Sequence, residues 1–408
     1  MIDLRQLVEP GDTVLWGQGG AQPRSLVDAL LHRAPDLGGV TAFVGLSFDA
    51  RVAATTGLAL RSYGALGALA GAPVEVLRCH MSALPGLIRS GRQPVDVVLC
   101  QVSPADAEGC HRLGVSVDYL HAALESARVV VAEVDPRVPA TGGPVRVHRS
   151  AFAATVPAEH GPTLVPDRPG GECERRIAGH VAALVPRAAT LQLGVGGLAA
   201  AVAGALREHR DLRVHSGLIG DWVVDLDDSG ALATDVDAPV VTGTALGSER
   251  LYGWLEGNPR VELRPVELVH PPAVTSALNA FVAVNQALQV DLDGQVGAEA
   301  VGGRYLGAIG GQVDFLRGAA ASPGGVGIIA LPSTTRDGAS RIVEHLDGPV
   351  TTAAADVGWV VTEHGAVDLR GTTRRERARA LLSVADPVHR DRLSGVVRDR
   401  GVALPGGR

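Results

Sequence analysis

The sequence predicts an α/β protein whose two similar halves each hold a mainly parallel sheet. A strand–turn–helix–strand unit occurs twice: TVLWGQGGAQPRSLVDALLHRAPDLGGVTAFVG begins at Thr13, and TLQLGVGGLAAAVAGALREHRDLRVHSGLIG begins at Thr190. In both copies a short apolar strand precedes a G-x-G-G turn, and apolar residues recur at helical spacing after it. Strands that alternate with helices favour mainly parallel sheets with helices on both faces. We therefore expect two tandem, doubly wound α/β domains with the site between them.

Glycines occupy the same three places in both turns: Gly17, Gly19 and Gly20 in the first copy, Gly194, Gly196 and Gly197 in the second. Such a turn at a helix N-terminus can direct backbone N–H groups at a phosphate or an oxyanion. A tight strand-to-helix turn also needs glycine without any ligand, so both interpretations stay open here. Neither copy completes the G-x-G-x-x-G pattern of a dinucleotide site. In the first helix, Ser25 with Asp28 three residues later predicts a helix start at the serine.

A looser repeat and one irregular segment suggest where the chain divides. VDVVLCQVSPADAEG from Val95 and FVAVNQALQVDLDGQVG from Phe281 both read as strands that run into an acidic, glycine-containing turn. The segment GPTLVPDRPGGE, residues 161–172, is rich in proline and glycine, which is typical of a junction. We place an N-terminal domain at residues 1–165 and a C-terminal domain at residues 172–408.

The composition excludes several classes of function. The chain of 408 residues is long enough for two or three domains, and its formal net charge of −7 leaves no basic excess for binding nucleic acid. Every basic residue other than histidine is arginine, since the sequence contains no lysine. Chemistry that needs lysine, such as a Schiff base or the lysine of a phosphate-binding Walker loop, is therefore excluded.

The cysteines predict a reducing compartment. Cys79, Cys100, Cys110 and Cys173 show no C-x-x-C spacing, and the start MIDLRQLVEPGDT lacks the charged and apolar regions of a signal peptide. No run of about 18 apolar residues predicts a membrane span. We therefore expect a cytoplasmic protein. The pairs Cys79-His80 and Cys110-His111 lack a metal-ligand spacing, so no metal site is predicted.

One glycine-rich segment of the second half favours a functional role. In GAIGGQVDFLRGA, residues 307–319, glycines stand beside Gln312 and Phe315. A surface loop needs glycine but has no use for phenylalanine next to glutamine and aspartate, whereas a loop that admits a ligand to its backbone uses all of them. We expect this segment to line a site.

A second segment carries an acid and a histidine at the end of a strand. VVTEHGAVDLRG, residues 360–371, predicts a buried strand that ends at Glu363 and His364. A solvated strand terminus explains both residues as well as a catalytic role does. The following segment TTRRERARALLSV, residues 372–384, predicts an amphipathic helix with a solvated arginine face.

The ordered motifs together resemble the acetyl-CoA hydrolase/transferase family. The resemblance runs through VDVVLCQVSPADAEGCHRLGVSVDY, VVVAEVDPRVPATGG, LQLGVGG, VNQALQVDLDGQVGAEAVGG, GAIGGQVDFLRGA, LPSTTRDGASRIV and VVTEHGAVDLRG, which cover most of the chain. It implies two CoA-transferase-type α/β domains, a homodimer, and a coenzyme A thioester as substrate with no covalently bound cofactor. In the family mechanism that it implies, a glutamate attacks the acyl-CoA and then carries CoA as a glutamyl thioester, which an acceptor carboxylate discharges.

The resemblance also implies which residues bind the thioester. Backbone amides of the glycine loops would stabilise the oxyanions. On this basis the expected CoA-binding residues are Gly194, Gly196, Gly197, Gly310, Gly311 and Gln312.

At the position of the family nucleophile this sequence departs from the pattern. The family motif resembles H-T-E-x-x-x-D, and the chain reads HSGLIGD from His215, which places Gly217 where the glutamate is expected. A glycine cannot form the anhydride. Other positions also differ: His270 and Pro271 stand where asparagines are frequent, Ala354 where arginine is, and Asp135 where asparagine is.

Several reactions remain open after this departure. Hydrolysis or transfer to an unusual acceptor is favoured, because loss of the glutamate side chain leaves space for a water or another acceptor beside the thioester. The candidate bases are Glu299, His215, Asp221 and Glu363. Structural roles are equally open: a strand-end acid for Glu299, a packed histidine for His215, a helix cap for Asp221. Carboxylate transfer through another acid, first of all Glu299, stays possible, and the alternative from another class is a catalytically silent acyl-CoA-binding or regulatory protein.

Overall fold

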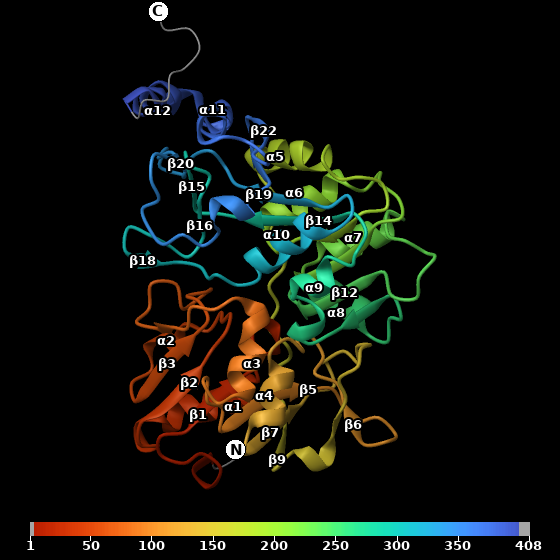
Figure 1. The fold of residues 1–408 in the computed structure, drawn as a ribbon. Helices are drawn as coiled ribbons and strands as arrows, with labels where there is room; N and C mark the ends of the chain where they lie inside the picture. Colours follow the sequence, from red (N-terminus) through yellow and green to blue (C-terminus); the bar gives the residue numbers. More distant parts are fainter. Residues whose placement is uncertain (1–3, 400–408) are drawn as a thin grey trace, which may run out of the picture.

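The computed structural model of the protein describes residues 4–399. Two large, mainly parallel sheets form its core (Figure 1). The first sheet has seven strands, and all its neighbouring pairs are parallel. In spatial order they are β4 (Glu75–Val76), β3 (Leu58–Ser62), β2 (Val40–Phe43), β1 (Thr13–Trp16), β5 (Val97–Val102), β7 (Val129–Val134) and β9 (Ala154–Pro157). Around them lie α1 (Arg24–Arg33), α2 (Ala50–Ala54), α3 (Leu84–Arg89), α4 (Leu120–Ser126) and the antiparallel pair β6 (Cys110–His111) and β8 (Val147–His148).

The second sheet has eight strands, of which β22 at one edge is antiparallel to its neighbour. In spatial order they are β13 (Val261–Leu263), β12 (Val240–Ala245), β11 (Arg213–Ile219), β10 (Thr190–Gln192), β14 (Phe281–Gln286), β19 (Val326–Ala330), β21 (Trp359–Thr362) and β22 (Gly365–Asp368). Its helices are α5 (Glu172–Ala182), α6 (Gly197–Ala205), α7 (Trp222–Asp228), α8 (Glu249–Leu255), α9 (Pro272–Thr275), α10 (Gln312–Ala321), α11 (Arg374–Val384) and α12 (Pro387–Asp399).

Short elements complete the described part of the chain. The small strands are β15 (Gln289–Asp291), β16 (Val296–Gly297), β20 (Ile342–Val343), β17 (Ala300–Val301) and β18 (Arg304–Tyr305). The short 3₁₀ helices are η1 (Leu4–Gln6), η2 (Gly19–Ala21), η3 (Ala34–Asp36), η4 (Met81–Ala83), η5 (Arg149–Ala151), η6 (Val266–Leu268) and η7 (Ala354–Asp356). The predicted α/β class with mainly parallel sheets is confirmed. The predicted domain limits at 165 and 172 stay a prediction.

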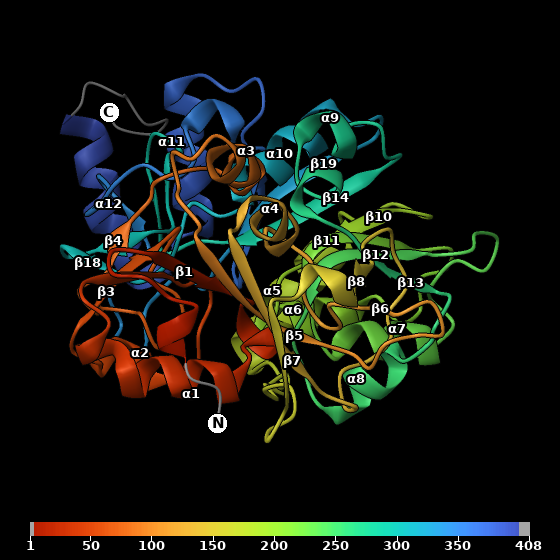
Figure 2. The ribbon, with the colours of Figure 1, turned by 90° about the horizontal axis from the view of Figure 1, so that it is seen from below.

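The repeated sequence unit occupies the same place in both sheets. β1 lies between β2 and β5, and β10 lies between β11 and β14, so each copy supplies a central strand, the helix after it and the next strand outward. In the first sheet Val14 and Trp16 pack with Leu30 of α1, whereas Leu15 between them packs on the opposite face with α3 and α4. Figure 2 shows α1 and α2 on one side of this sheet and α3 and α4 on the other. A central strand buried on both faces reads as a continuous apolar run, as TVLW does.

The second sheet is also covered on both faces. Val282 and Val284 of β14 face the core that includes α5 and α6, and Phe281 and Ala283 face a smaller cluster with Phe315 of α10. α9 and α10 lie on the side of this sheet that faces the first half (Figure 1). The face that carries α9 and α10 is therefore the one next to the junction of the two halves.

Backbone contacts join the two halves directly. Ser116 forms a β-bridge with Thr244, and Gly64 forms one with Ala308. An ion pair between Arg78 and the fully buried Glu299 adds a charged contact across the junction. In residues 4–399 no helix combines the length and the apolarity that a membrane crossing requires.

Candidate active site around Gly217 and His270

Gly217 lies near the carboxyl end of β11 and is partly exposed, and an imidazole occupies the space beside it. A Cβ atom built on Gly217 would come within 2.6 Å of His270 Nε2 and 3.0 Å of His270 Cε1. Such distances are shorter than van der Waals contact, so a side chain at residue 217 requires His270 to move. The sequence predicted open space next to the thioester at this point; the structure fills it with His270.

His270 is a buried, neutral histidine. Its residue is 4% exposed, and its ring packs against the ring of Phe315 with a centroid separation of 4.9 Å. Burial, together with the nearby His215, lowers the pKa of His270 to about 3, so the imidazole is uncharged at neutral pH. Its Nδ1 is buried without a hydrogen-bond partner. The side chain therefore keeps an unused polar atom within an apolar cluster.

His215, one of the predicted bases, points to the same side of β11 as Gly217, because residues two apart share a face of a strand. Its Nε2 donates to the carbonyl of Val269 at 2.9 Å, and its ring meets the edge of Phe281. Burial lowers the pKa of His215 to about 4. The structure thus brings His215, Gly217 and His270 together, with both imidazoles neutral.

The second glycine segment reaches the same place. A Cβ built on Gly311 would come within 2.6 Å of His270 Cδ2 and 2.9 Å of Phe315, so Gly217 and Gly311 flank the imidazole from two elements. Helix α10 begins at the next residue, Gln312, whose side-chain Nε2 is buried without a partner. A helix N-terminus with an unused amide donor favours negative charge at this point.

The glycines of the second G-x-G-G turn have open space above them. A Cβ on Gly194 or Gly196 would meet no atom within 4 Å, and Gly196 needs its φ of +93°. The amide of Gly196 already donates to Asp167 Oδ1 at 3.2 Å, and the amide of Trp222 donates to Asp167 Oδ2 at 3.1 Å. The Gly196 amide, which the sequence suggested as a donor to a phosphate or an oxyanion, is therefore bound by the Asp167 carboxylate of the predicted linker.

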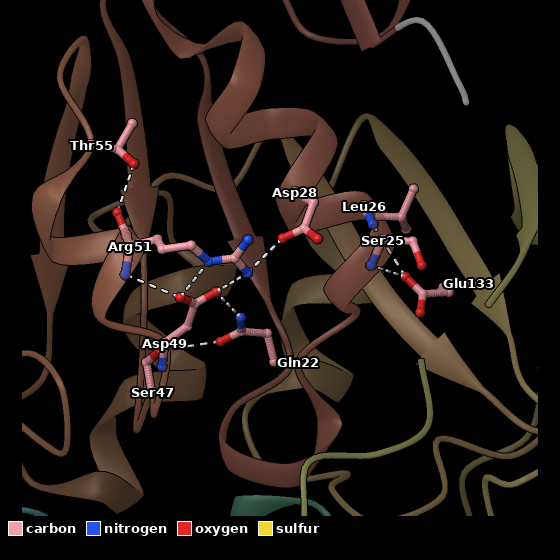
Figure 3. Close-up of polar contacts among 9 residues, drawn as sticks. All are labelled: Gln22, Ser25, Leu26, Asp28, Ser47, Asp49, Arg51, Thr55 and Glu133. Atoms are coloured by element: carbon pink, nitrogen blue, oxygen red, sulfur yellow. Dashed lines mark hydrogen bonds and ion pairs between the residues drawn. The ribbon is translucent and has the colours of Figure 1, made fainter. Parts of the chain in front are cut away.

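The first G-x-G-G turn is packed against protein. A Cβ on Gly20 would lie 2.3 Å from the hydroxyl of Tyr252, and one on Gly17 would lie 2.6 Å from a backbone carbonyl. Helix α1 begins at Arg24, and the carboxylate of Glu133 accepts from the amides of Ser25 and Leu26 at 2.9 and 3.1 Å (Figure 3). Here the glycines serve a tight turn.

The predicted start of helix α1 at Ser25 was wrong. The residue before the helix is Pro23, and no side chain caps the helix in the manner of a capping box. Asp28 instead pairs with Arg51 at 2.7 Å (Figure 3), and the Ser25 hydroxyl accepts from the amide of Glu159. The carboxylate at this helix start belongs to Glu133, which is distant in the sequence, and not to Asp28 of the predicted local pattern.

Two family models match the chain. The model described as acetyl-CoA hydrolase/transferase N-terminal domain matches residues 68–148, and the model described as acetyl-CoA hydrolase/transferase C-terminal domain matches residues 247–396. The 4-hydroxybutyrate coenzyme A transferase of Clostridium kluyveri is 40% identical over 330 residues, which are 79% of this chain and 77% of that protein. The chain belongs to the acetyl-CoA hydrolase/transferase family.

Solved structures of the family have the same fold. A 4-hydroxybutyrate CoA-transferase from Porphyromonas gingivalis superposes with a TM-score of 0.81 at 34% identity, covering 98% of this chain and 97% of the other. RipA from Yersinia pestis superposes with a TM-score of 0.91 at 30% identity, covering 98% of this chain and all of the other. The relatives are CoA-transferases and acetyl-CoA hydrolases, so the predicted recognition and the enzyme class are confirmed.

Two further predicted bases of this family member hold protein contacts. Asp221 accepts from the hydroxyl and the amide of Ser248 at 2.6 and 3.0 Å, and from the amide of Asp167. Glu299 accepts from Arg78, Tyr305 and Thr351, and its side chain has no exposed surface. These contacts suit structural roles, and the catalytic role of either residue stays a prediction.

His270 is a site residue that was not among the predicted catalytic or binding residues. The sequence analysis noted it only as a departure from a position where asparagine is frequent. One signal in the sequence could have pointed to His270. Gly217 and His270 were both expected to depart from the family pattern, which suggested that they belong to one site. Their contact through space depends on how β11 packs against the segment before α9, and no local pattern encodes that distance.

Proposed function

We propose that this family member cleaves a short-chain acyl-CoA thioester and passes the acyl group to water, without a glutamyl–CoA intermediate. The observation that carries the proposal is the pair Gly217 and His270: an imidazole occupies the space beside Gly217, the residue that we align with the family nucleophile. A carboxylate route through residue 217 has neither the carboxylate nor the room for it.

In this proposal His270 orients and deprotonates the attacking water. A neutral imidazole offers one lone pair and one N–H, and the low pKa of His270 keeps it neutral over the physiological range. A base with a pKa of about 3 is weak, so we expect slow turnover. Glu299, His215 and Asp221 remain alternative bases, with most of their hydrogen-bonding atoms engaged by protein groups.

The glycine segments would receive the thioester. Gly194, Gly196 and Gly310 leave open space where a Cβ would stand, and the unpartnered Nε2 of Gln312 supplies a donor at the start of α10. With Gly197 and Gly311 they form the proposed CoA-binding set. Developing negative charge on the thioester oxygen would be stabilised at this helix N-terminus.

The remaining expectations belong to the same proposal. We propose a homodimer, as the family resemblance implies, in the cytoplasm, a reducing compartment that suits the four unpaired cysteines. A second candidate reaction is CoA transfer to a carboxylate, which the names of the relatives favour. A third is acyl-CoA binding without turnover.

Free-thiol release from a panel of short acyl-CoAs, with and without acetate, tests the proposal. We expect release without acetate in the unmutated protein and at least a tenfold loss in His270→Gln. The matched control is His180→Gln on α5, which should release CoA at the unmutated rate. Release that requires acetate would overturn hydrolysis, and acyl-CoA binding without release would leave a binding protein.

A further inference from the structure

Three potential metal ligands meet at the end of β21, away from the thioester site. Glu363 and His364 follow this strand, and Asp386 lies in the link between α11 and α12. One ligand atom from each residue lies within 4.8 Å of the other two. Among residues 4–399 this is the one group of three histidine, cysteine or acidic side chains that meets this criterion.

The contacts within the group are too long for hydrogen bonds. His364 Nε2 lies 3.6 Å from Glu363 Oε1 and 3.7 Å from Asp386 Oδ2, and it is buried without a hydrogen-bond partner. Tetrahedral Zn²⁺ with bonds of about 2.1 Å separates its ligand atoms by about 3.4 Å. The observed spacing is close to that edge length. The three atoms thus surround a point at which an ion would bind all of them.

Hydrogen bonds from Ser333 fix the orientation of the Glu363 carboxylate. The amide and hydroxyl of Ser333 donate to the two oxygens of Glu363 at 2.9 and 2.7 Å. Groups that orient a ligating carboxylate from behind are a regular feature of metal sites.

We propose that Glu363, His364 and Asp386 bind a divalent zinc ion. One imidazole nitrogen and two carboxylate oxygens suit Zn²⁺, and water completes the coordination. Two partly buried carboxylates so close together repel each other, and a divalent cation offsets both charges. The sequence predicted no metal site, because these ligands are adjacent or distant in the chain and follow no known spacing.

The ion would fasten the C-terminal helices to the second sheet. Glu363 and His364 stand between β21 and β22, and Asp386 lies in the two-residue link between α11 and α12. β22, α11 and α12 lie together at one end of the molecule (Figure 1). Zinc bound there would hold this end in place, and its binding is independent of the proposed thioester chemistry.

Another arrangement explains the same contacts without a metal. His364 would pair directly with the Glu363 and Asp386 carboxylates. In that case a chelator would not change stability. The two arrangements therefore differ in a measurable way.

Calorimetric titration of the chelator-stripped protein with Zn²⁺ decides between them. We expect one equivalent to bind at micromolar concentration or tighter and to raise Tm, with at least a tenfold weaker Kd in His364→Gln and in Asp386→Asn. The control is His345→Gln, because exposed His345 lies 3.6 Å from Glu344 and belongs to no such three-ligand group. It should bind zinc as the unmutated protein does.

Cobalt gives a readout that needs no variant. Co²⁺ added to the stripped protein should produce the visible absorption of a four-coordinate site, and Zn²⁺ should displace it. Absence of zinc binding, or equal binding in His364→Gln, would overturn the proposal.

Discussion

Gly217 and the His270 side chain share one volume of the protein. The imidazole stands where the first side-chain atom of residue 217 would lie, 2.6 Å from it. Phe315 packs on the ring, and Gly311 flanks it on another side, so the ring has little room to turn away. A change at either position therefore depends on the residue at the other.

Restoring the nucleophile tests this dependence. Gly217→Glu alone should lose about 1–3 kcal/mol of stability through overpacking and should form no covalent adduct. Gly217→Glu combined with His270→Asn removes the clash, and we expect it to form a glutamyl–CoA thioester that borohydride or hydroxylamine traps. Urea unfolding and mass spectrometry of the trapped protein are the measurements. A folded double variant that binds acyl-CoA but yields no adduct would contradict a transferase-like geometry.

Helix starts in the two copies are held by carboxylates from different places. Glu133 of β7 receives two amides of α1, whereas Asp167 of the linker receives the amides of Gly196 and Trp222 (Figure 3 shows the first). Amides at a helix start lack partners within the helix, and an anion there also interacts well with the helix dipole. The duplication kept this physical requirement and met it with different residues.

Removing the carboxylate at α1 should destabilise the first half. Glu133→Ala leaves the amides of Ser25 and Leu26 without their acceptor, at a cost of roughly 1–3 kcal/mol for each buried donor. We expect a total loss of about 2–4 kcal/mol in urea unfolding, and a smaller loss in Glu133→Gln, which keeps an acceptor. Glu159→Ala, an exposed glutamate beside the same helix, is the control and should change stability by less than about 0.5 kcal/mol. A loss that small in Glu133→Ala would contradict the capping role.

At the scale of the whole molecule, a buried polar network crosses the junction of the halves. Asp118 accepts from Gln18 of the first G-x-G-G turn and from the Thr244 hydroxyl of the second half at 3.2 Å. The Tyr63 hydroxyl donates to Gln18 Oε1 at 2.7 Å. Burial raises the pKa of Asp118 to about 7, and its Oδ1 has no hydrogen-bond partner. Below this pH the carboxyl at the junction is mostly neutral.

This pKa gives stability a predictable dependence on pH. Between about pH 4 and pH 7 the folded protein keeps the Asp118 proton and the unfolded chain releases it, so the folded state binds more protons. Stability from this group then falls as pH rises, by up to about 1.4 kcal/mol per pH unit. Asp118→Asn removes the proton, so we expect its stability relative to the unmutated protein to increase from pH 5 to pH 7 in urea unfolding. The control Asp36→Asn, an exposed site, should show no such change, and a flat difference for Asp118→Asn would contradict the assignment.

Much of the fold and part of the site could be predicted from the sequence. The apolar run of β1, the duplicated turn and the alternation of strands with helices determine the α/β class, because they depend on local periodicity. Gly217 and the glycines of the two loops were also visible, since each is a single position in a motif. The helix start at Ser25 was wrong, because a local serine pattern competes with Glu133, which arrives from a distant strand.

By itself, then, the sequence determined the architecture and the family, and it led to the prediction that Gly217 stands at the position of the family nucleophile. Tertiary structure alone decided that His270 fills the space beside Gly217, that Asp167 and Glu133 occupy the helix starts, and that Asp386 meets Glu363 and His364. The physical reason is the range of the interactions. Strand and helix patterns arise between neighbours in the chain, whereas burial, pKa shifts and ligand geometry arise between segments that only packing brings together.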